Sequence, residues 1–283
     1  MTPHTTTAQR HLLPLIRQVD HALVRLARAD DTEALHDVRV SLRRLRTWMR
    51  AFGTRIGVDR EQQKQLRLLV HRTNPLRDRE IELVWLRLQT SGLALAQRRG
   101  VEALYRSGTQ VYRRALRALC ADLRKNWPPL ARSLRGVLRP AATQLDARTL
   151  HKVLRRTRRE LLAELKRIHS ARGSAALHRA RILAKRLRYI LEPYRDDSTD
   201  IEASVATLTQ LQDDFGAMHD CVVIRTRLKH IDAPLVDLLS RRARDQQRAL
   251  FKTVRTRHLG KALLLLKRVL RRSEQALTSP AQM

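Results

Sequence analysis

The chain has 283 residues, a length that can bury one large core or two smaller ones. Lys and Arg number 58 against 27 Asp and Glu, and the resulting net charge of +31 is shared almost evenly by the residues before and after position 142. This distribution excludes a basic tail as the source of the charge, and it favours a polyanionic partner that is bound by the folded body.

Apolar residues recur at three- and four-residue steps along nearly the whole chain, and no stretch alternates as a strand does. We therefore predict an all-α fold. The first helix is expected near residues 8–29, with Val19, Leu23 and Leu26 on one stripe. Helix breakers predict roughly ten to twelve helices, and they fall at Gly53, Asn74-Pro75, Gly92, Pro128-Pro129, Pro140, Gly173, Gly216 and Asp232-Ala233-Pro234.

The second predicted helix starts at Asp30 and Glu33, whose spacing resembles a capping box, and ends at Gly53, and it carries two stripes. Its apolar stripe consists of Val38, Leu42, Leu45, Met49 and Phe52. A basic stripe, about 120° away at about 100° per residue, consists of His36, Arg39, Arg43, Arg46 and Arg50. The basic side chains thus flank the core-facing side, where they are placed to line a groove between helices.

The same pattern returns in the second half of the chain, where His178 corresponds to His36. We call the spacing between these two histidines the repeat offset, and two residues separated by it are called equivalent. The second apolar stripe is Ala180, Ala184, Leu187, Leu191 and Tyr194, and its flanking stripe is His178, Arg181, Lys185, Arg188 and Glu192. Glu192 is equivalent to Arg50, and we expect it to pair with Arg188 one helical turn earlier. The repeat predicts an internal duplication with two units, residues 1–142 and 143–283, that hold one anionic ligand between them.

The repeat offset persists downstream, where Arg77-Asp78 matches His219-Asp220. Asp78 and Asp220 are expected to begin helices or to pair with nearby arginines. Cations further along the chain are also equivalent in the repeat, namely Arg99, Arg106 and Arg113 in the first unit and Arg241, Arg248 and Arg255 in the second. They form either a solvated helix face or further contacts to the ligand.

Motifs for catalysis and for metal or cofactor binding are absent from the sequence. His36-Asp37 and His219-Asp220 resemble metal-ligating pairs, but neither pair is repeated at the offset, and the arginines around them would repel a metal ion. Phosphate-binding glycine loops, nucleophile elbows and dinucleotide fingerprints do not occur. We predict no catalytic residues, no metal and no cofactor.

The repeated pattern closely resembles the conserved histidine α-helical domain family, known as CHAD. The matching residues are His36, Arg39, Arg43, Arg44 and Arg46, then His178, Arg181, Lys185, Arg186 and Arg188, with Arg77-Asp78 and His219-Asp220 downstream. The sequence departs from the pattern at His219, where arginine is expected. The resemblance implies two tandem four-helix bundles related by pseudo-twofold symmetry, a basic groove or channel between them, and binding of inorganic polyphosphate, here in a member without an attached enzyme.

Composition agrees with that partner. Arg outnumbers Lys 49 to 9, and guanidinium groups match phosphate oxygens, although an arginine-rich genome would give the same ratio. Aromatic residues make up only 4% of the chain, few for stacking unpaired bases. No run approaches the roughly 18 apolar residues of a membrane span, and the two cysteines suggest no disulfide framework.

The function predicted from the sequence is non-enzymatic polyphosphate binding by a cytoplasmic protein associated with polyphosphate granules and not with membranes. The alternatives are a non-specific nucleic-acid-binding protein of the nucleoid type and an enzyme acting on polyphosphate or a nucleoside triphosphate. The predicted polyphosphate-binding residues are His36, Arg39, Arg43, Arg44, Arg46, Arg50, Arg77, Arg106, Arg113, His178, Arg181, Lys185, Arg186, Arg188, Arg248 and Arg255.

Overall fold

The computed structural model describes residues 6–26, 33–138, 144–145, 147–169, 174–229, 235–260 and 262–277. Within these ranges the chain forms ten α-helices and one 3-10 helix, which confirms the all-α prediction and the expected number of helices. A two-residue antiparallel pairing joins β1 (Thr6–Thr7) to β2 (Gln144–Leu145). The helices are α1 (Ala8–Arg25), α2 (Ala34–Phe52), α3 (Arg60–Arg72), α4 (Asn74–Arg87), α5 (Leu95–Leu138), α6 (Ala147–Lys166), α7 (Ser174–Leu191), η1 (Glu192–Asp197), α8 (Thr199–Leu228), α9 (Leu235–His258) and α10 (Ala262–Ala276).

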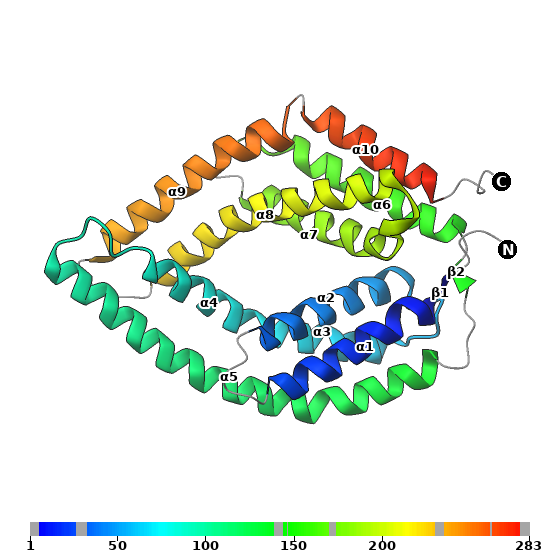
Figure 1. Cartoon of the computed structure of the whole chain (residues 1–283), viewed down its shortest axis with the longest axis horizontal. Helices are drawn as coiled ribbons and strands as arrows, with labels where there is room; N and C mark the ends of the chain where they lie inside the picture. The colour runs from blue at the N-terminus through cyan, green and yellow to red at the C-terminus, as the bar shows by residue number, and fades with distance from the viewer. Residues whose placement is uncertain are drawn as a thin grey trace.

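Helices α1–α5 form one group and α6–α10 form the other (Figure 1). The two groups meet where α2 packs against α7 and α4 packs against α8, and the long outer helices α5 and α9 come together only at one end. One apolar core runs through both groups, and a smaller cluster lies where α4, α5, α8 and α9 meet. The helices that carry the two predicted basic stripes therefore lie next to each other in the middle of the molecule.

The two motif helices face the core as their apolar periodicity predicts. Every member of the first apolar stripe, from Val38 to Phe52, is at most 1% exposed, and the second stripe from Ala180 to Tyr194 is at most 2% exposed. Burial of such side chains stabilises a fold by roughly 1.5–3 kcal/mol each. The core thus fixes the rotation of α2 and α7, and with it the direction of the flanking cations.

Two of the predicted helix breaks are wrong. Helix α5 continues through Pro128 and Pro129, and helix α8 continues through Gly216. The prolines are exposed and next to the buried Trp127, Leu130 and Ala131, so packing of that face holds the helix together although hydrogen bonds are lost. Helix α5 is accordingly bent and not interrupted (Figure 1). A single glycine costs a helix only about 1 kcal/mol, less than the burial of the neighbouring Phe215 and Met218 contributes.

Other predicted boundaries are confirmed. Helix α2 ends at Phe52 before Gly53, and α4 starts at Asn74 beside Pro75. Gly92 has a φ of +69°, a left-handed backbone that glycine adopts without strain, in the turn before α5. Asp30, Pro140, Gly173 and the segment 232–234 lie outside the described residues, and Glu33 precedes the first residue of α2 without a capping hydrogen bond to its side chain.

Helix boundaries differ between the two groups at particular substitutions. The segment equivalent to α3 and α4 is the single helix α8, where Ala217 stands at the position equivalent to Pro75. The equivalent of α5 is divided into α9 and α10 at Gly260, which has a φ of +60°. Local residue choice accounts for these differences, and the internal duplication itself stays a prediction.

Candidate functional site

Five cations from three helices converge where the two groups of helices meet, and we call them the central cluster. Arg39 and Arg43 come from α2, Arg77 from α4, and Arg181 and Lys185 from α7. Burial is the main cause that lowers the pKa values of Arg181 and Lys185. The charges of Arg43 and Arg77 also lower the pKa of Arg181, which Asp220 raises, and those of Arg181, Arg43 and Arg39 also lower the pKa of Lys185. Coulombic effects of this kind require proximity, so the structure brings together the central parts of both predicted rows.

Two guanidinium groups of the central cluster have buried nitrogens without a hydrogen-bond partner in the described structure. These are Nε of Arg39 and Nε of Arg181, which are equivalent residues of the repeat. Arg39 as a whole is only 3% exposed. A buried donor without an acceptor is costly, and an anionic ligand is one source of the missing acceptors.

Burial and mutual repulsion make the central cluster poorly compensated electrostatically. Burial, reinforced by Arg181, Arg43, Arg188 and Arg39, lowers the pKa of Lys185 to about 6. Burial is also the first cause that lowers the pKa of Arg39, to about 9. Both shifts mean that adding positive charge here is unfavourable without an anion.

Three carboxylates lie near the central cluster. Glu80 is 3.7 Å from Nη1 of Arg39 and 3.5 Å from Nη1 of Arg77, and it accepts a hydrogen bond of 2.9 Å from the Tyr112 hydroxyl. The charge of Asp78 acts on Arg39 and Arg43. Burial raises the pKa of Asp220, an effect that Arg77, Arg181 and Lys185 oppose.

The expectation that Asp78 and Asp220 begin helices is wrong. Asp78 is the fifth residue of α4, and Asp220 lies deep inside α8. The alternative role, placement beside arginines, is the one the structure has. The helix-start interpretation failed because α4 already begins at Asn74 and α8 continues through Gly216, so neither aspartate meets a helix terminus.

A second group of cations, the rim cluster, consists of Arg46, Arg50, Arg67 and Arg186. Burial lowers the pKa of Arg186, followed by the charges of Arg50 and Arg46, and the pKa of Arg46 is lowered by burial and then by Arg50, Arg67 and Arg43. Next to it is a pocket of about 310 Å³, lined by Arg46, Met49, Arg50, Arg60, Gln63, Lys64, Leu66 and Arg67.

The sequence analysis missed the α3 contribution to this pocket, namely Arg60, Lys64 and Arg67. Their equivalents in the second half are Glu202, Ala206 and Thr209, so the repeat could not single them out. The signal in the sequence that could have indicated these three residues is the cationic face of α3, the helix that follows the first motif.

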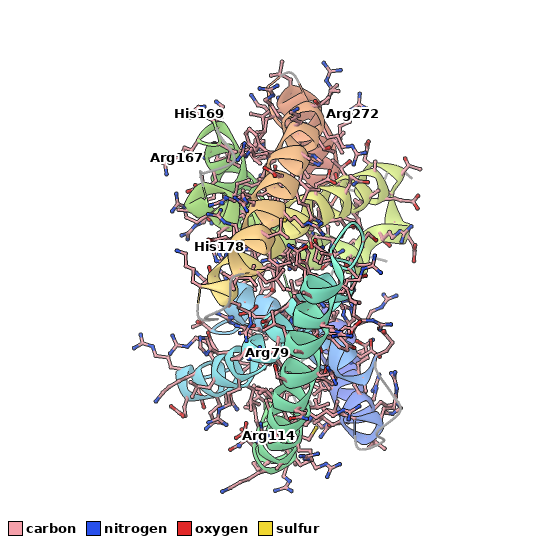
Figure 2. All side chains as sticks on the ribbon, turned by 90° about the vertical axis from the view of Figure 1, so that its left-hand side faces the viewer. Arg79, Arg114, Arg167, His169, His178 and Arg272 are labelled. Carbon is pink, nitrogen blue, oxygen red and sulfur yellow. The ribbon has the colours of Figure 1, made fainter. Side chains whose placement is uncertain are left out.

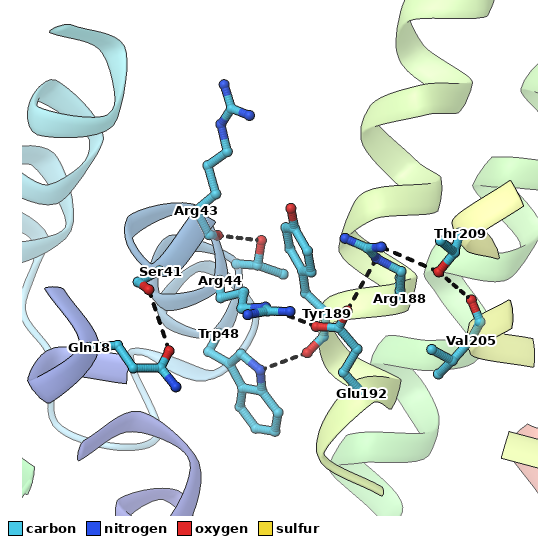
Figure 3. A network of polar contacts seen from close by, with 11 residues as sticks. Gln18, Ser41, Arg43, Arg44, Trp48, Arg188, Tyr189, Glu192, Val205 and Thr209 are labelled. Carbon is cyan, nitrogen blue, oxygen red and sulfur yellow. Dashed lines mark hydrogen bonds and ion pairs between the residues drawn. The ribbon is translucent and has the colours of Figure 1, made fainter. Parts of the chain in front are cut away.

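Two predicted ligand residues, Arg44 and Arg188, instead meet at Glu192. Glu192 lies 2.9 Å from Nε of Arg44 on α2 and 3.3 Å from Nε of Arg188 on α7, so the predicted pairing with Arg188 is confirmed and extended (Figure 3). Both guanidinium groups also lie over the Tyr189 ring, at 5.7 Å and 5.1 Å from its centroid. The Trp48 indole N–H donates to the Tyr189 carbonyl at 3.0 Å. We call this contact between the two groups of helices the Glu192 junction.

Glu192→Gln should lower the free energy of unfolding by about 1–2 kcal/mol, because it removes the charge that compensates two half-buried guanidinium groups. Urea denaturation measures the change. The matched control is Glu202→Gln, whose partner Arg195 is 3.0 Å away but whose pair is more than half exposed, and it should cost clearly less than Glu192→Gln because solvent screens the pair. Equal effects of the two variants would mean that the Glu192 junction contributes nothing specific.

The histidines that open the two motifs differ in their surroundings. His36 is exposed near the start of α2, and no described contact joins it to the central cluster. His178 is also exposed, but its ring lies 5.3 Å from that of His219. Burial and the nearby Arg181 and Lys185 lower the pKa of both His178 and His219, that of His219 to about 4.

The four predicted long-helix arginines are exposed, and none of them is among the charges that shift the pKa values of the central cluster. Arg106 and Arg113 are exposed on α5, and Arg248 and Arg255 are exposed on α9. Arg248 forms a 3.5 Å ion pair with Asp245 in which both side chains are about 70% exposed. Figure 2 shows nitrogen-tipped side chains extending from both groups of helices, with Arg114 and Arg272 towards opposite ends. This geometry favours the solvated-face interpretation for the outer arginines.

Within the described ranges, no group of three or more His, Cys, Asp or Glu side chains could hold a metal ion. A search of the same part of the chain for membrane spans finds no helix with the necessary length and apolarity.

The protein is all-helical, and cationic side chains are buried where its two groups of helices meet. Some of these side chains have hydrogen-bond donors without acceptors among the described residues. The model of the CHAD domain family matches residues 10–229, and the chain therefore belongs to the CHAD domain family, which is associated with polyphosphate binding. The crystal structure of the CHAD domain from the plant Ricinus communis is similar, with a TM-score of 0.70 over 99% of this chain and 94% of that chain. At 21% identity this likeness shows the fold alone. Among curated proteins, none matches the chain.

Proposed function

We propose that this protein binds inorganic polyphosphate between two duplicated helical units, without catalysing a reaction on it. The observation that carries the proposal is the central cluster, in which equivalent arginines of α2 and α7 have buried nitrogens without acceptors among the described residues. Phosphate oxygens supply such acceptors along the whole length of a polymer. The direction of a polyphosphate chain matters little, so a receptor built from matched halves suits it.

Burial of the central cluster favours a thin polymer over duplex nucleic acid. DNA presents its phosphates on a broad, stiff cylinder with a major groove about 12 Å wide, and such a surface does not reach a residue that is only 3% exposed, such as Arg39. A flexible unbranched chain has no bulk beside its phosphates. The pocket beside the rim cluster gives such a chain further cations outside the centre, and one of them, Arg46, lies close enough to Arg43 of the central cluster for the two charges to interact.

Long-chain polyphosphate should bind at near-physiological salt more tightly than duplex DNA of equal charge, and its affinity should fall steeply with added salt through release of counterions. Competition titration with fluorescent polyphosphate measures both. Equal affinity for the two polymers would contradict the proposal. It would favour the second candidate, non-specific nucleic-acid binding, which the +31 charge and the exposed outer arginines support.

Polyphosphate recovered after incubation of the protein with magnesium or manganese should keep its length, because the proposal includes no reaction on the polymer.

Binding of this kind would place the protein on polyphosphate granules. The protein would then serve as a scaffold or deliver a partner to the granule surface.

A further inference from the structure

A pocket of about 280 Å³ adjoins the central cluster on the side of α7 and α8, and its lining is unlike that of the rim-cluster pocket. Apolar side chains make up most of it, with two imidazoles and one amide among them. The lining residues are Ala175, Leu177, His178, Phe215, Met218, His219, Val222 and Gln247. Pockets that bind organic molecules are mostly apolar with a few placed polar groups, and this pocket fits that description although the protein has a charge of +31.

Several lining residues of this pocket differ in kind from their equivalents in the first half of the chain. In the repeat, His219 corresponds to Arg77 and Val222 corresponds to Glu80. Arg77 and Glu80 form an ion pair of 3.5 Å beside Arg39. The departure from the repeat at His219 is therefore accompanied by a second one, because the charged Glu80 of the first half is equivalent to the apolar Val222 of the second.

Inorganic polyphosphate, which consists of phosphate groups alone, finds no positive charge in the lining of this pocket. Burial and the nearby cations lower the pKa values of His178 and His219, so both rings are uncharged at neutral pH. Neutral imidazoles offer planar surfaces, hydrogen-bond donors and acceptors, but no charge for a phosphate. Two cations of the central cluster, Arg181 and Lys185, lie close enough to both rings for their charges to contribute to these shifts.

We propose that this pocket receives the base of a nucleoside polyphosphate while its phosphates lie on Arg181 and Lys185. This inference rests on the proposed function, because it uses the same central cluster for the phosphates. The base is the part of such a ligand that is planar, apolar on its faces and polar at its edge, as the pocket requires. The Phe215 and histidine rings supply aromatic surface, and the Gln247 side chain, whose Oε1 accepts from Arg225 at 3.1 Å, supplies an amide at the edge of the pocket.

The test compares ATP with inorganic tripolyphosphate by calorimetry in magnesium-free buffer. Both probes carry three phosphates, but tripolyphosphate has one more ionisable oxygen, so charge alone favours it. We expect ATP to bind the wild-type protein about tenfold more tightly, because a stacked and enclosed base adds to the affinity. Val222→Trp, which fills the pocket from α8, should abolish this advantage and leave tripolyphosphate binding unchanged.

Two further variants keep the test decisive. Ala175→Phe fills the pocket from the exposed start of α7 and should act as Val222→Trp does, while Ala206→Trp, exposed on α8 outside the pocket, should leave both affinities as in the wild type. The inference is overturned if ATP binds the wild-type protein no better than tripolyphosphate, or if pocket-filling variants with wild-type circular dichroism weaken both probes equally. If neither tripolyphosphate nor long-chain polyphosphate binds, the proposed function itself is wrong. This result differs from one in which both polymers bind and only the advantage of ATP is missing.

Discussion

Replacing Arg39 and Arg181 together by alanine should lower the affinity for long-chain polyphosphate at least about a hundredfold. Hydrogen bonds to a charged group contribute about 1.5–3 kcal/mol each, and about 1.4 kcal/mol corresponds to a factor of ten in affinity. Both guanidinium groups have a buried Nε without a partner in the described structure, so both have unused capacity for a ligand. Isothermal titration at near-physiological salt measures the change.

The matched control for this double variant is Arg106→Ala with Arg248→Ala. These residues are also equivalent in the repeat, and their removal takes away the same charge, but both side chains are exposed on outer helices. We expect the control to lose only a few-fold in affinity, through weaker long-range attraction. If the control loses as much as the central variant, then binding depends on total charge and the central cluster is not the site.

Lys185→Met should raise the free energy of unfolding at pH 7, by roughly 2–4 kcal/mol, because a pKa shift of one unit corresponds to about 1.4 kcal/mol. The pKa of Lys185 falls from 10.5 to about 6 on folding, through burial and then through Arg181, Arg43, Arg188 and Arg39. Between these two values the unfolded chain binds the proton that the folded protein lacks, so wild-type stability should rise with pH in this range. A methionine of similar length removes that cost and should flatten the rise.

Urea titrations from pH 6 to pH 10 compare the wild-type protein, Lys185→Met and the control Lys152→Met, which replaces an exposed lysine of α6. Parallel curves for the wild-type protein and Lys185→Met would show that Lys185 keeps its charge in the fold. A bound polyanion should favour the charged amine, so the wild-type protein should take up a proton with polyphosphate at pH 7.5. Calorimetry in buffers of different ionisation enthalpy detects this uptake, which Lys185→Met should lack.

Much of the fold could be predicted because it follows from periodicity. The burial of Val38, Leu42 and Leu45 on one stripe of α2 depends on 3.6 residues per turn, a local property that the spacing displays directly. Where prediction failed, a tertiary contact outweighed a local preference. Pro128 and Gly216 predict helix breaks from local preference, but buried neighbours on the same helices hold both segments in the core.

The predicted site residues separate into groups that the sequence alone does not distinguish. Arg43 and Arg44 are adjacent in the motif, yet Arg43 joins the central cluster while Arg44 is paired with Glu192 of the other group of helices. Arg106 repeats at the offset as faithfully as Arg39 does, but it lies exposed on α5. Spacing identifies which positions resemble each other, and it gives no measure of which side chains meet across the fold.

The helical class, the faces of the motif helices and the large positive charge follow from composition and from intervals along one chain segment, so they could be predicted. The folded arrangement is needed to tell which cations have buried donors without acceptors among the described residues, which are paired with a carboxylate and which are exposed to water. It also surrounds Lys185 with positive charge. The reason is that the free energy of a charge depends on its hydration and on its neighbours in space, and those neighbours come from α2, α4, α7 and α8, which are distant in the sequence.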